Sequence, residues 1–326
     1  MTLFLLRRLA GFIVTLWVAS VVVFAALELL PGSAAQVRLG ETASPEAVAA
    51  LEAQLGLNRP VPLRYAEWLS GLARGRTALS SSYDTPTAEL IAERLQVSLP
   101  LAVLAMALTT VVALMLGLFA AAHHRRLGDV GVMAASQLGM AVPAFWFAIL
   151  LILLFAVRLE WFNAGGFPGW TDPDSGAVTA ASLWEGLRAL VLPAAALAAV
   201  QAAILARVTR SAVLEVLRED FVRTARAKGL SRRAVLWRHV LRNAMIPVLT
   251  VMGLQFANLV AGTVVIEKVF VLPGLGLLVF QAIANRDLVV VRDVVMLLAA
   301  AVVAINSVVD LLYAVLDPRL RTREAA

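Results

Sequence analysis

Six stretches of the chain carry no charged residue over about the length that a helix needs to cross a membrane. A helix rises about 1.5 Å per residue, so crossing the hydrocarbon layer takes about 20 residues. The stretches are 9–27, 96–122, 130–157, 189–206, 244–266 and 294–309, and 311–316 extends the short last one beyond Asp310. Apolar and polar positions do not alternate within them, as they would in barrel strands. Because lipid satisfies no backbone polar group, the pattern predicts an all-α integral membrane protein with six transmembrane helices.

The first stretch has an alternative interpretation as a signal peptide. Arg7 and Arg8 precede it and Ser33, Ala34 and Ala35 follow it, which is the outline of a cleavable leader. Its apolar part is longer than the core of a typical leader, and five more apolar stretches follow. We therefore expect residues 1–30 to contain a first transmembrane helix.

The composition also indicates a membrane protein. Hydrophobic residues make up 61% of the chain and charged residues 15%, against about 45–50% and about 25% in soluble proteins. The chain has no cysteine, which excludes disulfides and thiolate metal sites. Its net charge of +6 is better matched by anionic lipid headgroups than by nucleic acid, because no basic patch accompanies a nucleic-acid-binding motif.

The distribution of basic residues predicts the orientation. The N-terminal segment, the loop after the second stretch, residues 207–242 and the tail together hold 17 of the 28 Lys and Arg residues, ten of them in 207–242. Lys and Arg mark cytoplasmic loops, so both termini are expected on the cytoplasmic side. Residues 31–96 then form an external segment with short helices at 44–55 and 86–95, residues 97–318 form the remaining membrane core, and 319–326 form a cytoplasmic tail.

The loop at 207–246 has a pattern of its own. Leu214, Leu217, Phe221 and Ala225 recur at helical spacing, and Gly229 then ends the pattern. Ser231 is a candidate cap for a second helix. The expected apolar stripe of that second helix is Leu230, Ala234, Trp237, Leu241 and Ala244. The loop therefore predicts a helix–glycine–helix elbow, which could lie on anionic headgroups or dock into a groove of a protein partner.

The residues of this elbow resemble a known motif. The segment 219–231, Glu-Asp-Phe-Val-Arg-Thr-Ala-Arg-Ala-Lys-Gly-Leu-Ser, is similar to the coupling loop of ABC importer permeases, in the version of the dipeptide, oligopeptide and nickel subfamily. Segments 141–146, 241–247, 270–276 and 310–319 resemble the same subfamily. One departure is Gly75-Arg76-Thr77-Ala78, where the subfamily has Gly-Asp-Leu-Gly.

The resemblance implies a type I ABC importer permease in a bacterial cytoplasmic (inner) membrane. Such a permease pairs with a second, homologous permease and with two ATPase subunits, which bind ATP and Mg²⁺, and an extracytoplasmic peptide-binding protein delivers the substrate. This chain lacks a Walker A pattern, so it is expected to bind no cofactor or metal and to have no catalytic residue. Peptides are the implied substrate, and nickel, glutathione or another small solute is the alternative.

The resemblance also assigns roles to residues of the elbow. Phe221 would be an apolar anchor in a cleft of the ATPase, and the basic residues would pair with acids of that subunit. The implied ATPase-coupling residues are Glu219, Asp220, Phe221, Arg223, Thr224, Ala225, Arg226, Ala227, Lys228, Gly229 and Leu230.

Polar residues and prolines within the stretches suggest a translocation path. Gln255 and Asn258 would touch the peptide, or alternatively form hydrogen bonds between helices. Pro143, followed by Phe145, would act as a hinge, or alternatively as a tolerated kink. A secondary transporter should carry charges at the centre of its spans, and none is found there. His123, His124 and His239 lie in predicted loops, and we expect them at the surface.

Overall fold

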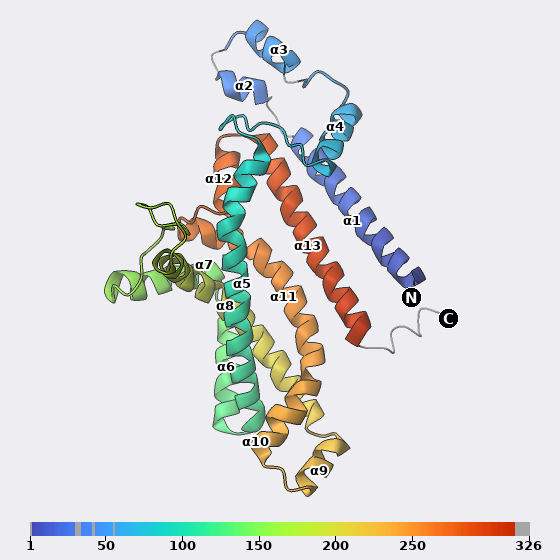
Figure 1. Ribbon diagram of the computed structural model, residues 1–326, viewed down its shortest axis with the longest axis vertical. Helices are drawn as coiled ribbons and strands as arrows, with labels where there is room; N and C mark the ends of the chain where they lie inside the picture. Colours follow the sequence, from blue (N-terminus) through green and yellow to red (C-terminus); the bar gives the residue numbers. More distant parts are fainter. Residues whose placement is uncertain (1, 30–33, 41–42, 55, 317–326) are drawn as a thin grey trace. The chain divides into compact units, whose positions relative to one another are not determined.

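The computed structural model describes residues 2–29, 34–40, 43–54 and 56–316, and this part of the chain is predominantly helical (Figure 1). The α-helices are α1 Thr2–Glu28, α2 Ala34–Leu39, α3 Pro45–Gln54, α4 Val61–Ala73, α5 Thr87–Ala122, α6 Leu127–Ala141, α7 Ala144–Leu151, α8 Ala180–Val216, α9 Asp220–Ala227, α10 Arg232–Ala234, α11 Leu241–Val269, α12 Leu275–Ala284 and α13 Leu288–Leu316. Two π-helical segments, Ile152–Arg158 and Val235–Val240, follow α7 and α10. The predicted tail at 319–326 lies outside the described residues.

Five of the six predicted spans correspond to helices that are long and apolar enough to cross a membrane. These are Leu6–Glu28, Thr87–Ala122, Ala180–Val216, Arg232–Val269 and Leu288–Val309. The expected short helix at 86–95 is the beginning of α5 rather than a separate element. Pro100 and Pro193 lie inside continuous helices, because neighbouring groups can compensate for one missing N–H donor.

The third predicted span is broken rather than kinked. Helix α6 and the helix that starts at Ala144 meet at an angle of 103°. Val142 is extended, with φ −92° and ψ 125°, as expected for a residue before proline. Pro143 precedes the first turn of α7, with φ −61° and ψ 138°. The two residues therefore end one helix and start the next in a new direction.

The chain divides into two compact units. The first comprises Met1–Ser98 and Pro273–Ala304. Its apolar core includes Leu278, Ala282, Val290 and Val294, all of which are fully buried. Two buried acids bind the segment that connects α4 to α5. Asp287 accepts hydrogen bonds from the Ser80 hydroxyl at 2.5 Å and from the Ser82 N–H at 3.0 Å. Asp293 accepts hydrogen bonds from Trp68 and Thr87.

The second unit comprises Leu99–Leu272 and Ile305–Ala326. Helix α8 is its centre and packs against α6, α7 and α11. The buried face of α8 is rich in small residues, including Ala194, Ala206 and Ala212, which lets neighbouring helices approach closely. Gly117 of α5 shows how close: a Cβ atom there would lie 2.6 Å from Cβ of Thr209.

Candidate functional site: a helix–glycine–helix elbow

The predicted elbow is present between α8 and α11. Helix α8 ends at Val216, and α9 runs from Asp220 to Ala227. Gly229 follows with φ +82°, a conformation that favours glycine because it has no Cβ atom. Ser231 then caps α10, and its hydroxyl oxygen accepts a hydrogen bond from the Ala234 N–H at 3.2 Å. The turn at Gly229 and the cap at Ser231 were both predicted from the sequence.

The inward face of α9 differs from the predicted stripe. Val222, with no exposed surface, and Ala225 are buried in an apolar cluster with Val213 of α8 and Val235. Phe221 was expected on the same stripe as Ala225 but is 40% exposed. The non-helical residues between α8 and α9 interrupt the helical phase, so spacings counted across them do not hold. Phe221 consequently lies on the outward side, where it can contact another molecule.

The second arm of the elbow also departs from the predicted stripe. Ala244 is buried as predicted, but Val235 and Val240, which the stripe left out, are buried as well, and Trp237 is 53% exposed. The cause is the π-helical segment Val235–Val240, whose hydrogen bonds run from residue i to i+5. Its buried positions are therefore five residues apart, and a stripe counted at α-helical spacing misses them. Trp237 instead lines a shallow pocket of about 540 Å³ together with Ser231, Arg233 and Ala234.

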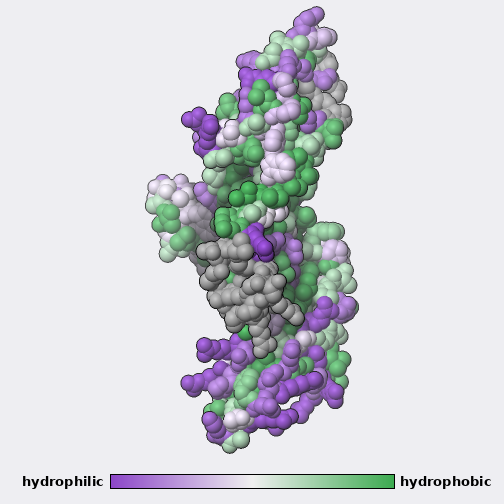
Figure 2. Space-filling model, turned by 90° about the vertical axis from the view of Figure 1, so that its right-hand side faces the viewer, coloured by the Kyte–Doolittle hydropathy of each residue, from purple (hydrophilic) through white to green (hydrophobic). Residues whose placement is uncertain are grey.

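The exposed surface of the elbow combines basic and apolar side chains. Figure 2 shows hydrophilic residues gathered in the lowest part of the view, where Figure 1 places α9 and α10. Arg223, Arg226 and Lys228 are exposed there, and Arg223 has only a long contact of 3.6 Å with Asp220, both side chains being highly exposed. Such a pair contributes little to stability. Its charges are therefore available to a partner.

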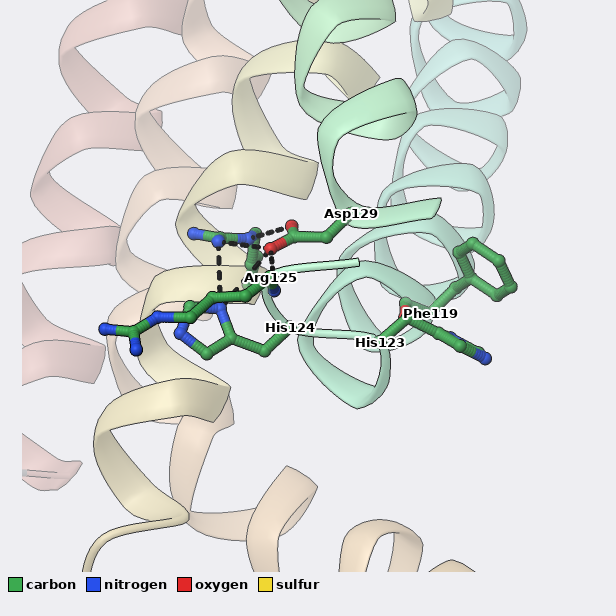
Figure 3. A network of polar contacts seen from close by, with 6 residues as sticks. Phe119, His123, His124, Arg125 and Asp129 are labelled. Atoms are coloured by element: carbon green, nitrogen blue, oxygen red, sulfur yellow. Dashed lines mark hydrogen bonds and ion pairs between the residues drawn. The ribbon is translucent and has the colours of Figure 1, made fainter. Parts of the chain in front are cut away.

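A partly buried ion pair connects the start of α6 to the end of α8 (Figure 3). Asp129 is 3% exposed, and its carboxylate accepts two hydrogen bonds from Arg210, at 2.5 and 2.7 Å. The Arg125 N–H donates to the same carboxylate at 3.0 Å, and the His124 ring lies 3.3 Å from it. A bidentate pair of this kind fixes geometry as well as charge. Because Arg210 is six residues before the end of α8, the pair fixes the helix that leads into the elbow.

Sequence reasoning missed this ion pair. Asp129 and Arg210 are 81 residues apart, and each lies next to several other charged residues in a loop or at a helix end. His124 is partly exposed, as expected, but it also contacts Asp129. His123 stacks on Phe119, with ring centroids 4.4 Å apart. A single acid beside a run of arginines was the only available signal, and it does not identify the partner.

The four residues predicted for a translocation path differ in how exposed they are. Pro143 is exposed at the break after α6, and Phe145 in the first turn of α7 is 47% exposed. Asn258 is exposed on α11. Gln255 is only 4% exposed, and its side-chain amide donates to the Gln201 carbonyl at 3.0 Å. The hydrogen bond between α11 and α8 agrees with the alternative interpretation of Gln255, and the role of all four residues in transport stays a prediction.

Comparison with known proteins assigns the family. The binding-protein-dependent transport system inner membrane component matches residues 113–322, and the N-terminal part of such components matches residues 1–102. The chain belongs to this permease family. A putative peptide transport system permease protein of Brucella abortus is 43% identical over 98% of this chain and 99% of its own length. A dipeptide transport system permease protein of Alkalihalophilus pseudofirmus is 37% identical over 98% of this chain and its own full length.

The fold of the permease agrees with this assignment. A chain from inward-facing structures of the methionine ABC transporter matches 70% of the permease and 96% of its own length, with a TM-score of 0.55 and 17% identity. At this identity the likeness concerns the fold alone. The elbow lies within the part of the permease that matches the family. Among the described residues, no group of three or more His, Asp or Glu side chains could hold a metal ion.

Proposed function

We propose that this chain is one permease subunit of an ATP-driven peptide importer in a bacterial inner membrane, with both termini on the cytoplasmic side. The elbow α9–Gly229–α10 is the observation on which the proposal depends. One of its faces is anchored in the protein through Val222 and Val235, while the other exposes Phe221 and basic side chains. This division suits a helix that a partner grips and that transmits the movement inward.

Force on α9 has two routes into the helices of the second unit. The first is the shared cluster that joins Val222 of α9 to Val213 of α8 and to Val248 of α11. The second is the chain itself, since only a short turn separates α9 from α8, which Asp129 holds in place through Arg210. A close-packed cluster resists compression, so a displacement of α9 displaces α8 and α11 rather than being absorbed.

The remaining subunits supply what this chain lacks. Two ATPase subunits bind ATP and Mg²⁺ and grip one elbow each, a second permease supplies the other half of the path, and a binding protein delivers the peptide from outside. Exposed Asn258 and Phe145 are candidates for weak contact with the peptide. The 103° break at Pro143 is a candidate hinge between inward-open and outward-open states.

Peptide transport by reconstituted proteoliposomes tests the proposal. The complete complex, reconstituted with the ATPase subunits facing outward and the binding protein enclosed, should move labelled dipeptide out of the vesicles only when ATP and Mg²⁺ are present outside. Unlabelled oligopeptide, nickel and glutathione, each supplied as competitor, distinguish peptide transport from the alternative substrates. Movement of peptide without ATP, or ATP-driven movement that nickel or glutathione abolishes and peptides do not affect, contradicts the proposal.

A further inference from the structure

A second pocket lies in the first unit, apart from the elbow. It has a volume of about 780 Å³ and opens between α4, the loop that follows α4, and the start of α13. Four arginines and three acids line it. Two of the arginines are already paired: Arg59 with Glu67 at 2.7 Å, and Arg64 with Glu28 through two hydrogen bonds of 2.7 and 2.9 Å. The arginines that remain are Arg76, which is exposed, and Arg292.

The side chain of Arg292 is held in place mainly by aromatic rings. It is only 18% exposed, and its guanidinium carbon lies 4.8 Å from the centre of the Trp68 ring and 5.9 Å from that of Phe24. Phe24, Tyr65 and Trp68 contact one another, with ring centroids 5.4 to 6.1 Å apart. Stacking of this kind orients a guanidinium without using its N–H donors.

The N–H donors of Arg292 have almost no acceptor within the protein. Its one polar partner among the described residues is Asp293, at a long distance of 3.5 Å. The Asp293 carboxylate is already engaged, since one oxygen accepts from Trp68 Nε1 at 2.8 Å and the other from the Thr87 hydroxyl at 2.5 Å. The terminal guanidinium nitrogens of Arg292 therefore have no acceptor among the described residues, and the side chain lines the pocket. A partly buried guanidinium with unused donors beside a pocket favours an external anion, which forms stronger, charge-assisted hydrogen bonds than water does.

The position of Arg292 along α13 indicates which anion. It is the fifth residue of a helix that begins at Leu288 and is apolar enough to cross the membrane, so it lies about 6 Å from the start of the helix. Aromatic and basic side chains near the end of a membrane span are favoured at the level of the lipid headgroups. Phosphate matches the planar, bidentate geometry of a guanidinium.

We propose that this pocket binds the phosphate group of a membrane phospholipid headgroup. Arg292 is the primary contact, and Arg76 adds charge at the open side. Arginine pairs with phosphate in this way, and a volume of about 780 Å³ is large enough for a headgroup. The bound lipid would join α1, α4 and α13 through the aromatic cluster. This inference does not depend on the identity of the transported substrate.

Native mass spectrometry of the purified complex tests the lipid site. The complex is extracted in a phosphate-free detergent and supplied with phosphatidylglycerol, with diacylglycerol of the same acyl chains, or with inorganic phosphate. The wild-type complex should retain one more phosphatidylglycerol molecule than the Arg292→Gln complex, with at least a tenfold difference in occupancy of that site. Diacylglycerol and inorganic phosphate should not replace the lipid at equal concentration.

Two further variants keep the test decisive. Arg76→Gln changes an exposed residue, so it should leave folding intact while lowering occupancy about threefold. Arg59→Gln is the matched control: it lines the same pocket, but its charge is paired with Glu67, and occupancy should not change. Equal retention of lipid by the wild type and by both the Arg292 and Arg76 variants overturns the proposal. Equal binding of diacylglycerol overturns recognition of phosphate, and equal binding of inorganic phosphate overturns the lipid in favour of a soluble anion.

Discussion

Substitutions of Gly229 test the elbow selectively, because they differ in the free energy needed to hold the backbone in its observed conformation. Its φ is +82°, and a Cβ atom built there meets nothing within 4 Å. A Cβ atom therefore costs no steric overlap. The effect of any substitution is the strain of holding a left-handed conformation, and residue types differ in that strain in a known order.

The magnitudes follow from this geometry. Alanine at this position costs about 1–2 kcal/mol, and asparagine costs less because its side chain favours the left-handed region. Proline is fixed near φ −65° and cannot adopt the observed angle. It also removes the Gly229 N–H, which donates to the Arg226 carbonyl at 2.9 Å. The elbow of Gly229→Pro must therefore adopt a different backbone conformation. In Gly229→Ala, the equilibrium constant for the observed conformation falls about 5- to 30-fold.

The ratio of peptide transported to ATP hydrolysed, measured in proteoliposomes, shows directly how well the elbow couples the two processes. Gly229→Asn should keep the wild-type ratio, Gly229→Ala should lower it several-fold, and Gly229→Pro should hydrolyse ATP with almost no transport. Gly131→Ala is the control, since Gly131 lies in α6 with open space around it and no positive φ. Normal transport by Gly229→Pro would refute the reasoning that the bend couples the two processes.

Three other predictions concern the packing around the site. Asp129→Asn leaves the partly exposed Arg210 without its charged partner and should lower the free energy of unfolding by about 1–3 kcal/mol. A double variant with Arg210→Gln should cost clearly less than the sum of the two single changes, and strict additivity would show that the pair is not coupled. Gly117→Ala places a Cβ atom 2.6 Å from a side-chain carbon of α8 and should lower the midpoint of thermal unfolding through a cost of about 1–3 kcal/mol; an unchanged midpoint would mean that α5 and α8 separate easily. Ser231→Ala removes the cap of α10 and should cost about 1 kcal/mol, and loss of transport without loss of thermal stability would assign Ser231 a different role.

The membrane spans and the shape of the elbow follow from the sequence because each depends on local chemistry. Uncharged length predicts a helix that crosses lipid, and Gly229 and Ser231 have conformational and capping preferences that act over a few residues. The beginning of α13 was less predictable. Asp287 and Asp293 are acids in an apolar region, and only the fold brings Ser80 and Thr87 to them.

The faces of the elbow helices could not be predicted because the helical phase is interrupted twice. Turn residues separate α8 from α9, and the π-helical segment at Val235–Val240 spaces buried positions five residues apart. Counting at α-helical spacing therefore predicted Phe221 and Trp237 on the buried faces, where the structure has Val222 and Val235 instead. The break at Pro143 was visible as a proline, but its size depends on the extended conformation of Val142, which proline favours without dictating.

Cross-linking from Phe221 tests the central proposal most directly. The chain contains no cysteine, so Phe221→Cys introduces a single reactive thiol on the outward side of α9. With a short bifunctional reagent that reacts with thiols and amines, this thiol should cross-link the permease to an ATPase subunit. The yield of the cross-linked product should change when a non-hydrolysed ATP analogue is added. Val178→Cys, in the loop before α8 and 64% exposed, should give no such product. Absence of an ATPase product from Phe221→Cys, with the thiol fully labelled, would contradict the proposal that the elbow is gripped by the ATPase.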